Sequence, residues 1–127
     1  MNYGVKMSEA YFFDTYALIE ILKGNKNYEK YKDCRIIISI FNLIEIHYSI
    51  LKFSQKLADS ILENYSPFVV KTSLDVIKEA NLFRIRNKRK NLSAADCIGY
   101  ITAENLNLKF LTGDKEFQNM ENVEFVK

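Results

Sequence analysis

Five short apolar stretches along the chain have the length and the residue types of β-strands. The stretch at residues 35–40 is β-branched and carries no charge after its first residue, which is typical of a strand buried on both faces. Pro67 precedes another stretch, and Gly113 ends a fourth. The predicted strands span residues 10–13, 35–40, 68–71, 109–112 and 122–126.

Between these strands, apolar residues recur at the spacing of helices. Gly24 and Asn25 end the first helical stretch, and Ser93 stands where the N-cap of the last one is expected. The predicted helices span residues 16–22, 41–52, 57–65, 74–87 and 93–104. Alternating strands and helices predict an α/β fold, a three-layer α/β/α sandwich around a central, mostly parallel sheet. No repeat or linker divides the chain, so one domain is expected over residues 1–127.

Length and composition exclude several classes of protein. A chain of 127 residues that is 48% hydrophobic and 27% charged is neither a disordered tail nor a disulfide scaffold. Its longest uncharged apolar run, residues 36–44, is far shorter than the roughly 20 residues of a membrane span. The first ten residues lack the apolar core of a signal peptide, so a cytoplasmic protein is expected.

Cysteine and histidine counts narrow the possible chemistry. Cys34 and Cys97 lie in apolar surroundings and are predicted to be buried, reduced thiols. His47, the only histidine, falls on the apolar side of its helix and is expected in the core. One histidine cannot build a multi-histidine zinc site. Enzymatic chemistry here would therefore use carboxylates, which bind hard cations.

A basic run precedes the last predicted helix. It places five positive charges within seven residues, at Arg84, Arg86, Lys88, Arg89 and Lys90. Such a run is a candidate phosphate-binding surface. It is equally typical of a solvated helix end, because lysine and arginine favour the last turn. The run alone does not decide between these interpretations.

Four acidic residues stand where a ligand site is expected. Asp14 directly follows one predicted strand and Asp114 stands two residues after another, and parallel sheets bind ligands at that edge. Asp96 is the only charged residue between positions 92 and 103, and Glu45 lies on the polar face of its helix. Each also has a purely structural interpretation: Asp14 as an N-cap, Asp114 as a turn residue, Asp96 as the capping-box partner of Ser93, and Glu45 as a solvated side chain.

The joint pattern of the four acids carries more weight than any one of them. Carboxylates gathered at one edge of a sheet repel one another unless a divalent cation neutralises them. One or two Mg²⁺ or Mn²⁺ ions in such a cluster can activate a water molecule and bind a scissile phosphate.

The sequence resembles the PIN domain family of metal-dependent ribonucleases, and most of all its small VapC-type toxins. The resemblance rests on residues 12–19, 42–45, 93–100 and 110–117, in this order and at this spacing. It implies an α/β/α fold in which Asp14, Glu45, Asp96 and Asp114 ligate or orient one or two Mg²⁺ or Mn²⁺ ions. It also implies that Thr15 and Thr112 support these acids through hydrogen bonds.

The resemblance further implies hydrolysis of RNA phosphodiesters by a metal-activated water, with the basic run holding RNA. A small antitoxin as partner and a homodimer are expected on the same ground, with apolar surface near residues 18–22 and 50–61 available for the dimer. Two departures stand out: thirteen residues precede Asp14, so that Met7 is an alternative start, and Gly113 replaces a bulkier residue. No consequence of Gly113 for the acids is expected.

Other functions remain open at the level of sequence. A housekeeping RNA-processing nuclease would carry the same acids without an antitoxin. A phosphate- or nucleotide-binding module would use the acids only as caps and turn formers. A flap-type DNA nuclease agrees less well, since such relatives are longer.

Overall fold

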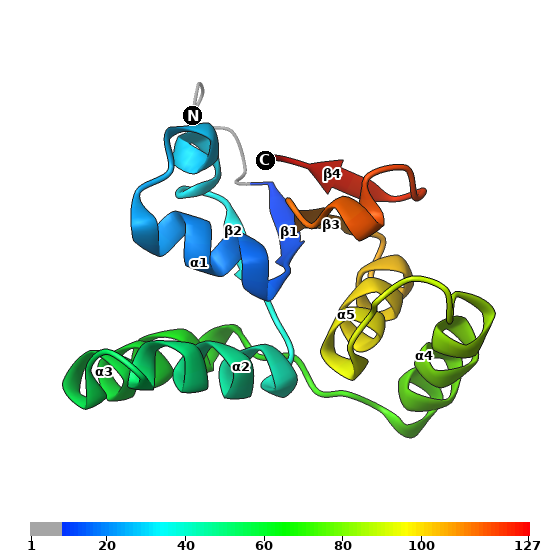
Figure 1. Ribbon diagram of the computed structural model, residues 1–127, viewed down its shortest axis with the longest axis horizontal. Coiled ribbons are helices and arrows are strands. Elements are labelled where there is room, and N and C mark those ends of the chain that lie inside the picture. The colour runs from blue at the N-terminus through cyan, green and yellow to red at the C-terminus, as the bar shows by residue number, and fades with distance from the viewer. Residues whose placement is uncertain (1–8) are drawn as a thin grey trace, which may run out of the picture.

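A four-stranded parallel sheet forms the centre of the computed structural model, which describes residues 9–127. The alternative start at Met7 lies outside these residues. The strands follow the order β2-β1-β3-β4, and every neighbouring pair is parallel (Figure 1). They are β1 (Ala10–Phe13), β2 (Arg35–Ile37), β3 (Lys109–Thr112) and β4 (Val123–Phe125).

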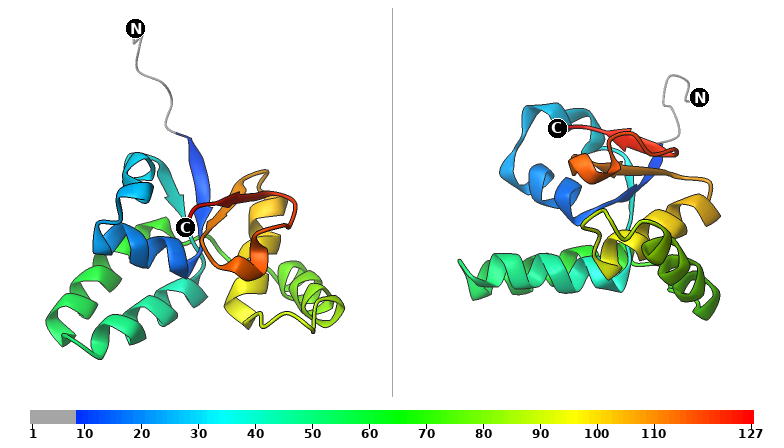
Figure 2. Two further views of the ribbon diagram at one scale, coloured as in Figure 1. Left: turned by 45° about the horizontal axis from the view of Figure 1, so that its top comes forward. Right: turned by 45° about the vertical axis from the view of Figure 1, so that its right-hand side comes forward.

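Helices cover both faces of this sheet and confirm the predicted three-layer α/β/α sandwich. On one side α1 packs on β1 and β3, with α2 against α1 and α3 against α2; on the other side α5 packs on the same strands and carries α4 (Figures 1 and 2). The helices are α1 (Thr15–Lys23), α2 (Ile40–Leu51), α3 (Gln55–Tyr65), α4 (Leu74–Arg86) and α5 (Ala94–Asn105). Three short 3₁₀ helices join them: η1 (Lys26–Tyr31), η2 (Ser66–Phe68) and η3 (Lys115–Phe117).

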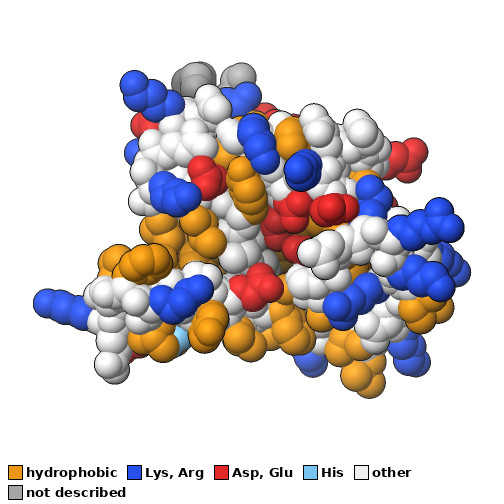
Figure 3. All heavy atoms as spheres, viewed as in Figure 1, with side chains coloured by type: hydrophobic (Ala, Val, Ile, Leu, Met, Phe, Trp, Pro, Cys, Tyr) orange, Lys and Arg blue, Asp and Glu red, His pale blue; other side chains and the backbone are white. Residues whose placement is uncertain are grey.

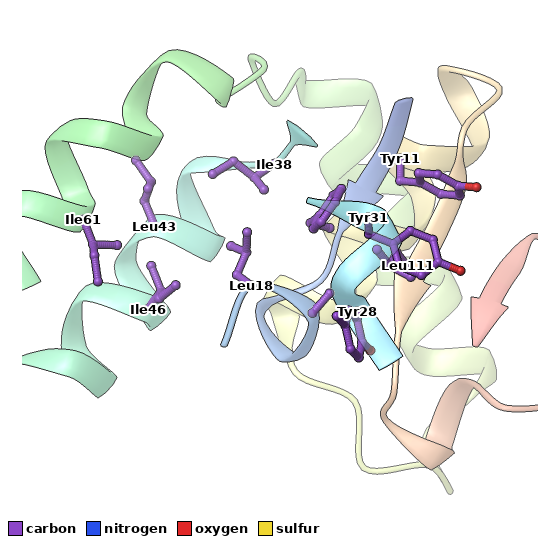
Figure 4. Close-up of a cluster of buried hydrophobic side chains, with 11 residues drawn as sticks. Tyr11, Leu18, Tyr28, Tyr31, Ile38, Leu43, Ile46, Ile61 and Leu111 are labelled. Atoms are coloured by element: carbon purple, nitrogen blue, oxygen red, sulfur yellow. The ribbon is translucent and has the colours of Figure 1, made fainter. Parts of the chain in front are cut away.

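The side chains of β1 divide the core into two apolar clusters. Tyr11 and Phe13 point to the cluster shared with α1, α2 and α3, which Figure 4 shows, and Phe12 points to the cluster under α4 and α5. This follows from the two-residue period of a strand, which sends successive side chains to opposite faces. Both faces of β1 are therefore buried, and the residue after the strand emerges at the edge of a closed core.

Helix α5 lies unusually close to the sheet at Gly99. A β-carbon built at Gly99 would lie 2.7 Å from Cε1 of Phe12 and 3.0 Å from Cε1 of Phe110. A residue without a β-carbon is therefore required at this position. Its neighbours are aromatic rings of β1 and β3.

Two strand predictions need correction. Residues 68–71 do not form a strand, because η2 runs into this segment with Pro67 in its first turn, and only an isolated bridge joins Val69 to Ile38. The strand predicted at residues 35–40 ends at Ile37, because Ser39 is already the N-cap of α2. The other strand and helix predictions are confirmed to within two residues at each end.

The structure also tests the expectations for the two cysteines, for His47 and for membrane-spanning helices. Cys97 is buried and Cys34 is half-buried; both thiols are free, and burial raises the pKa of Cys97 to about 11. His47 is half-buried and not in the core, and its Nε2 lies 2.9 Å from Oδ1 of Asp59 on α3. Within residues 9–127, no helix combines the length and the apolar character that crossing a membrane requires.

Candidate functional site

The first two acids of the site are brought together by the pairing of β1 with β3. Phe13 lies opposite Leu111 in the register, so Asp14 and Thr112 directly follow the paired residues at the same edge. The backbone N–H of Asp14 donates to the carbonyl of Leu111 at 3.0 Å. Asp114 comes two residues after Thr112 and lies at the same edge. This is the carboxyl edge of the parallel sheet, where the sequence predicted a site.

The other two acids approach from the helical layers on opposite sides of the sheet. Glu45 belongs to α2 and Asp96 to the first turn of α5. Burial raises the pKa of both Asp14 and Asp96. The charges of Asp96 and Glu45 raise the pKa of Asp14 further, and those of Glu45 and Asp114 raise the pKa of Asp96 further, so the other acids lie close enough to act on these two. In the space-filling view, acidic side chains surround a hollow near the middle of the face (Figure 3).

Asp14 lies deepest in this cluster. It is 3% exposed, and burial, followed by the charge of Asp96, raises the pKa of its carboxyl to about 8. Hydrogen bonds from Thr112 and from the backbone of Thr15 oppose this rise without cancelling it. A buried carboxylate is costly unless a positive charge accompanies it. Asp14 stands at the N-cap position of α1, yet its side chain makes no capping hydrogen bond, so capping does not explain an acid here.

Thr112 links two of the acids. Its hydroxyl donates to Oδ2 of Asp14 at 2.7 Å and accepts from the backbone N–H of Asp114 at 3.1 Å. The side chain is fully buried, and it has one proton to give. The bond from the Asp114 backbone therefore directs that proton to Asp14.

Thr15 makes a matching link on the other side. Its hydroxyl donates to Oε1 of Glu45 at 2.6 Å and accepts from Nδ2 of Asn42 at 3.1 Å. Asn42 is fully buried, although helical periodicity places it on the same polar face as Glu45. That face turns inward at the start of α2, because the polar groups there bond to α1 and do not face water.

Asp96 and Asp114 keep the structural roles that their positions suggested. Oδ2 of Asp96 accepts from the backbone N–H of Ser93 at 2.8 Å, which completes a capping box. Oδ1 of Asp114 accepts from the backbone N–H of Glu116 at 3.0 Å, at the start of η3. These roles do not exclude a ligand role, since a carboxylate has two oxygens and each bond engages only one.

The four acids thus share one design, which suits a hard divalent cation. In each carboxylate a protein donor is hydrogen-bonded to one oxygen: Oδ2 of Asp14, Oε1 of Glu45, Oδ2 of Asp96 and Oδ1 of Asp114. Oxygen donors of this kind are those that Mg²⁺ and Mn²⁺ prefer. Within residues 9–127, no three His, Cys, Asp or Glu side chains already stand close enough together to hold an ion. The chemistry of the donor set, four carboxylates, fits such an ion.

The basic run lies beside the acids and divides into two groups. Arg84 Nε donates to the carbonyl of Leu92 at 3.1 Å, and Lys90 Nζ donates to the carbonyl of Glu116 at 3.0 Å. These two side chains tie the loop between α4 and α5 to its surroundings. Three members are exposed and make no such bond within the described residues: Arg86, Lys88 and Arg89.

Sequence reasoning missed the buried amide of Asn42 as part of the site. The available signal was the pair Ser39 and Asn42, because an acceptor three residues after an N-cap serine is typical of a capping box. It also missed the contact of Gly113 with Tyr16, for which no local pattern exists. A β-carbon at Gly113 would lie 2.2 Å from Cε1 of Tyr16 and 2.3 Å from the carbonyl oxygen of Val126.

Three of the solved structures that share this fold are similar to this chain over nearly its whole length. They are a toxin-antitoxin complex from Klebsiella pneumoniae (TM-score 0.73, 22% identity, 90% of this chain and 95% of the matched chain), VapBC2 from Rickettsia felis bound to a promoter DNA fragment (0.69, 20%, 93% and 99%), and VapBC-1 from nontypeable Haemophilus influenzae (0.68, 17%, 91% and 96%). No curated protein matches the sequence.

A protein-family model assigns the chain to a family, whereas these structures show only a shared fold. The PIN domain model matches residues 11–123, a stretch that contains all four acids and both threonines of the site. The three-layer fold described above agrees with the fold of the matched structures. This protein therefore belongs to the PIN domain family.

Proposed function

We propose that this protein is a metal-dependent endoribonuclease and the toxin of a toxin–antitoxin pair. The observation that carries the proposal is the shared design of the acids. Four carboxylates from four separate segments meet at one edge of the sheet, and a protein donor holds each of them at one oxygen. PIN domain toxins are generally nucleases, and the fold matches components of toxin–antitoxin complexes.

The acids differ in what they would contribute. Asp14 and Asp96 are the strongest candidates to ligate a cation, because both are desolvated and lie within reach of each other's charge. Asp114 is the next ligand, and Glu45, held by Thr15, orients a water molecule at the edge of the site. One or two bound Mg²⁺ or Mn²⁺ ions would supply an activated water and neutralise the phosphate. Because this water would attack the phosphate, no serine, cysteine or histidine of the site needs to act as the nucleophile.

The exposed members of the basic run are the proposed contacts to RNA phosphates. Arg86, Lys88 and Arg89 stand on the chain just before the helix that carries Asp96. Figure 3 shows lysine and arginine side chains gathered on this flank of the acidic hollow. Phosphate contacts of this kind set affinity without reading sequence.

Neutralising these three side chains to glutamine is expected to weaken RNA binding and to flatten its salt dependence. Each lost phosphate contact lowers the slope of log K against log salt by about 0.7 for a single strand. Fluorescence anisotropy with a labelled single-stranded RNA across a salt series measures this slope. A matched triple variant neutralises exposed lysines elsewhere, at Lys26, Lys56 and Lys71. Equal slopes for the two triple variants would contradict the assignment.

An antitoxin is the proposed protein partner, since the matched structures are complexes of toxin and antitoxin. The chain offers an apolar groove of about 610 Å³ between α1, α2 and α3 for a partner segment. Phe53 at its rim is 86% exposed, and Leu22 and Leu57 are also exposed. The homodimer expected from the resemblance uses surface in this same region and stays a prediction.

Cleavage of a mixed single-stranded RNA pool tests the proposed activity. The wild type is expected to cut RNA with Mn²⁺ or Mg²⁺ and to stop when a chelator is added. Asp96→Asn is expected to lose activity by more than about 100-fold, since ligands matter more than the supporting residues whose loss costs 10–100-fold. The asparagine oxygen can still accept from Ser93, so the helix cap survives. Asp59→Asn, an exposed acid on α3, is the matched control.

The same pair of proteins separates the proposed toxin from the alternatives. Overproduced wild type is expected to stop growth of the host cell, and overproduced Asp96→Asn is not. Cleavage without growth arrest would favour the housekeeping nuclease. Intact RNA together with no affinity for Mn²⁺ would favour the phosphate- or nucleotide-binding module and overturn the proposal.

A further inference from the structure

A directed chain of hydrogen bonds runs from the start of α2 to Glu45. Its first member is the backbone N–H of Ser39, which donates to Oδ1 of Asn42 at 2.9 Å, and the Ser39 hydroxyl donates to the same oxygen at 2.9 Å. A backbone N–H can only donate, so the side-chain oxygen of Asn42 must face Ser39. The amide nitrogen of Asn42 must then point the other way, toward Thr15.

The roles of donor and acceptor at Thr15 are also fixed. Nδ2 of Asn42 can only donate, so the Thr15 hydroxyl accepts from it and gives its single proton to Oε1 of Glu45. A hydroxyl without this fixed donor would be free to rotate away from Glu45. Because Oε1 is engaged, Oε2 of Glu45 is the oxygen available to a cation or a water molecule.

Burial makes this series of hydrogen bonds rigid. Asn42 and Ser39 are fully buried, so water cannot replace either partner. The chain also spans two elements, because Thr15 begins α1 and the other members belong to α2 and its N-cap. It therefore fixes where Glu45 stands relative to Asp14, which directly precedes Thr15 in the sequence.

We infer that Asn42 is a positioning residue of the nuclease site, which orients Thr15 as a donor and thereby holds Glu45 in place. This inference rests on the proposed function of the acids and extends it to a residue that touches neither metal nor RNA. Position 42 requires an amide because the side chain must both accept a hydrogen bond from Ser39 and donate one to Thr15, and not only because of its size. A similar apolar side chain would fill the space and lose the direction of the chain.

The test measures Mn²⁺ affinity of the initially metal-free protein by titration calorimetry. Asn42→Leu and the smaller Asn42→Ala are each expected to weaken Mn²⁺ binding by about tenfold, as loss of a supporting partner does. Thr15→Val, which removes the hydroxyl, should weaken it similarly, and Thr15→Ser, which keeps it, should not. If Asn42 acts through Thr15, the double variant Asn42→Leu with Thr15→Val should bind no worse than the weaker single variant.

A control variant separates the positioning role of Asn42 from a general loss of stability. Ile61→Ala, a core substitution on α3, lowers the melting temperature without touching the chain of hydrogen bonds and should leave Mn²⁺ affinity unchanged. With saturating Mn²⁺, both Asn42 variants should lower kcat and leave KM for RNA unchanged, because a buried amide cannot contact RNA. Unchanged affinity in both Asn42 variants, or additive losses in the double variant, would overturn the inference alone. A wild type that binds no Mn²⁺ would overturn the proposed function beneath it.

Discussion

Replacing Asp14 with asparagine is expected to abolish RNA cleavage and, in the metal-free protein, to raise the melting temperature at pH 8 by about 5–15 °C. The two effects have one cause. Asp14 is the most buried acid of the site, and its environment disfavours the negative charge that the chemistry needs. An asparagine removes this penalty and can still accept the hydrogen bond from Thr112.

The pH dependence of this effect has a definite sign. The carboxyl of Asp14 has a pKa of about 8 in the folded protein and an ordinary pKa of 3.8 when unfolded. Between these values the unfolded chain has lost a proton that the folded chain keeps, so stability falls as pH rises from about 4 to about 8. At about 1.4 kcal/mol for each unit of pKa, the loss of unfolding free energy by linkage is at most about 6 kcal/mol. Asp14→Asn lacks this loss.

Thermal unfolding from pH 5 to pH 8, with chelator present, measures both parts of this prediction. The melting temperatures of wild type and Asp14→Asn should diverge as pH rises, and Mn²⁺ should stabilise only the wild type. Asp33→Asn, which changes an exposed aspartate away from the site, should follow the wild type. Parallel curves for wild type and Asp14→Asn would show that burial does not disfavour the charge of Asp14.

Gly113→Ala is expected to destabilise the protein by about 2–4 kcal/mol, at the upper end of what overpacking costs. The new β-carbon would overlap the ring of Tyr16 and the carbonyl of Val126. Neither neighbour can move freely. The backbone N–H of Val126 donates to Thr112 at 2.9 Å, and Nζ of Lys127 lies over the Tyr16 ring at 5.6 Å from its centroid.

Chemical denaturation of Gly113→Ala measures this loss, and a second substitution identifies its source. Tyr16→Leu removes one of the two clashing groups, so it should recover part of the stability in the Gly113→Ala background while destabilising the wild type. Because Asp114 follows directly, cleavage should fall along with stability. Wild-type stability in Gly113→Ala would show that the strand end can relax around a β-carbon.

Local patterns were sufficient for most of the fold, because strands and helices here differ clearly in period and caps. The αL conformation of Gly24, with φ of 75°, ends α1 where the sequence predicted a stop. The prediction of a strand at residues 68–71 failed although β2 is an edge strand with room for a partner, because the η2 helix already takes up Phe68. Pro67 and η2 leave this segment in register with Ile38 at one position only.

The candidate site was predictable where chemistry follows directly from chain position. The acids after β1 and β3 could be placed together, since carboxyl ends of parallel strands share an edge. Asn42 could not be placed, because helical periodicity shows which residues share a face and not what that face meets. The tight fit at Gly113 was equally invisible. Its two neighbours, Tyr16 and Val126, are set against it only by the tertiary structure.

The strand order also determines when the site can exist during folding. β1 lies between β2 and β3, so Asp14 meets Asp114 only after a loop of about 100 residues has closed. Contacts of such long sequence separation form late and slowly, because their entropy cost precedes any gain. A chain that has folded only α1, α2 and α3 around β1 and β2 holds Asp14 without the hydroxyl of Thr112. Folding intermediates of this kind would be inactive, so that activity reports completion of the whole sheet.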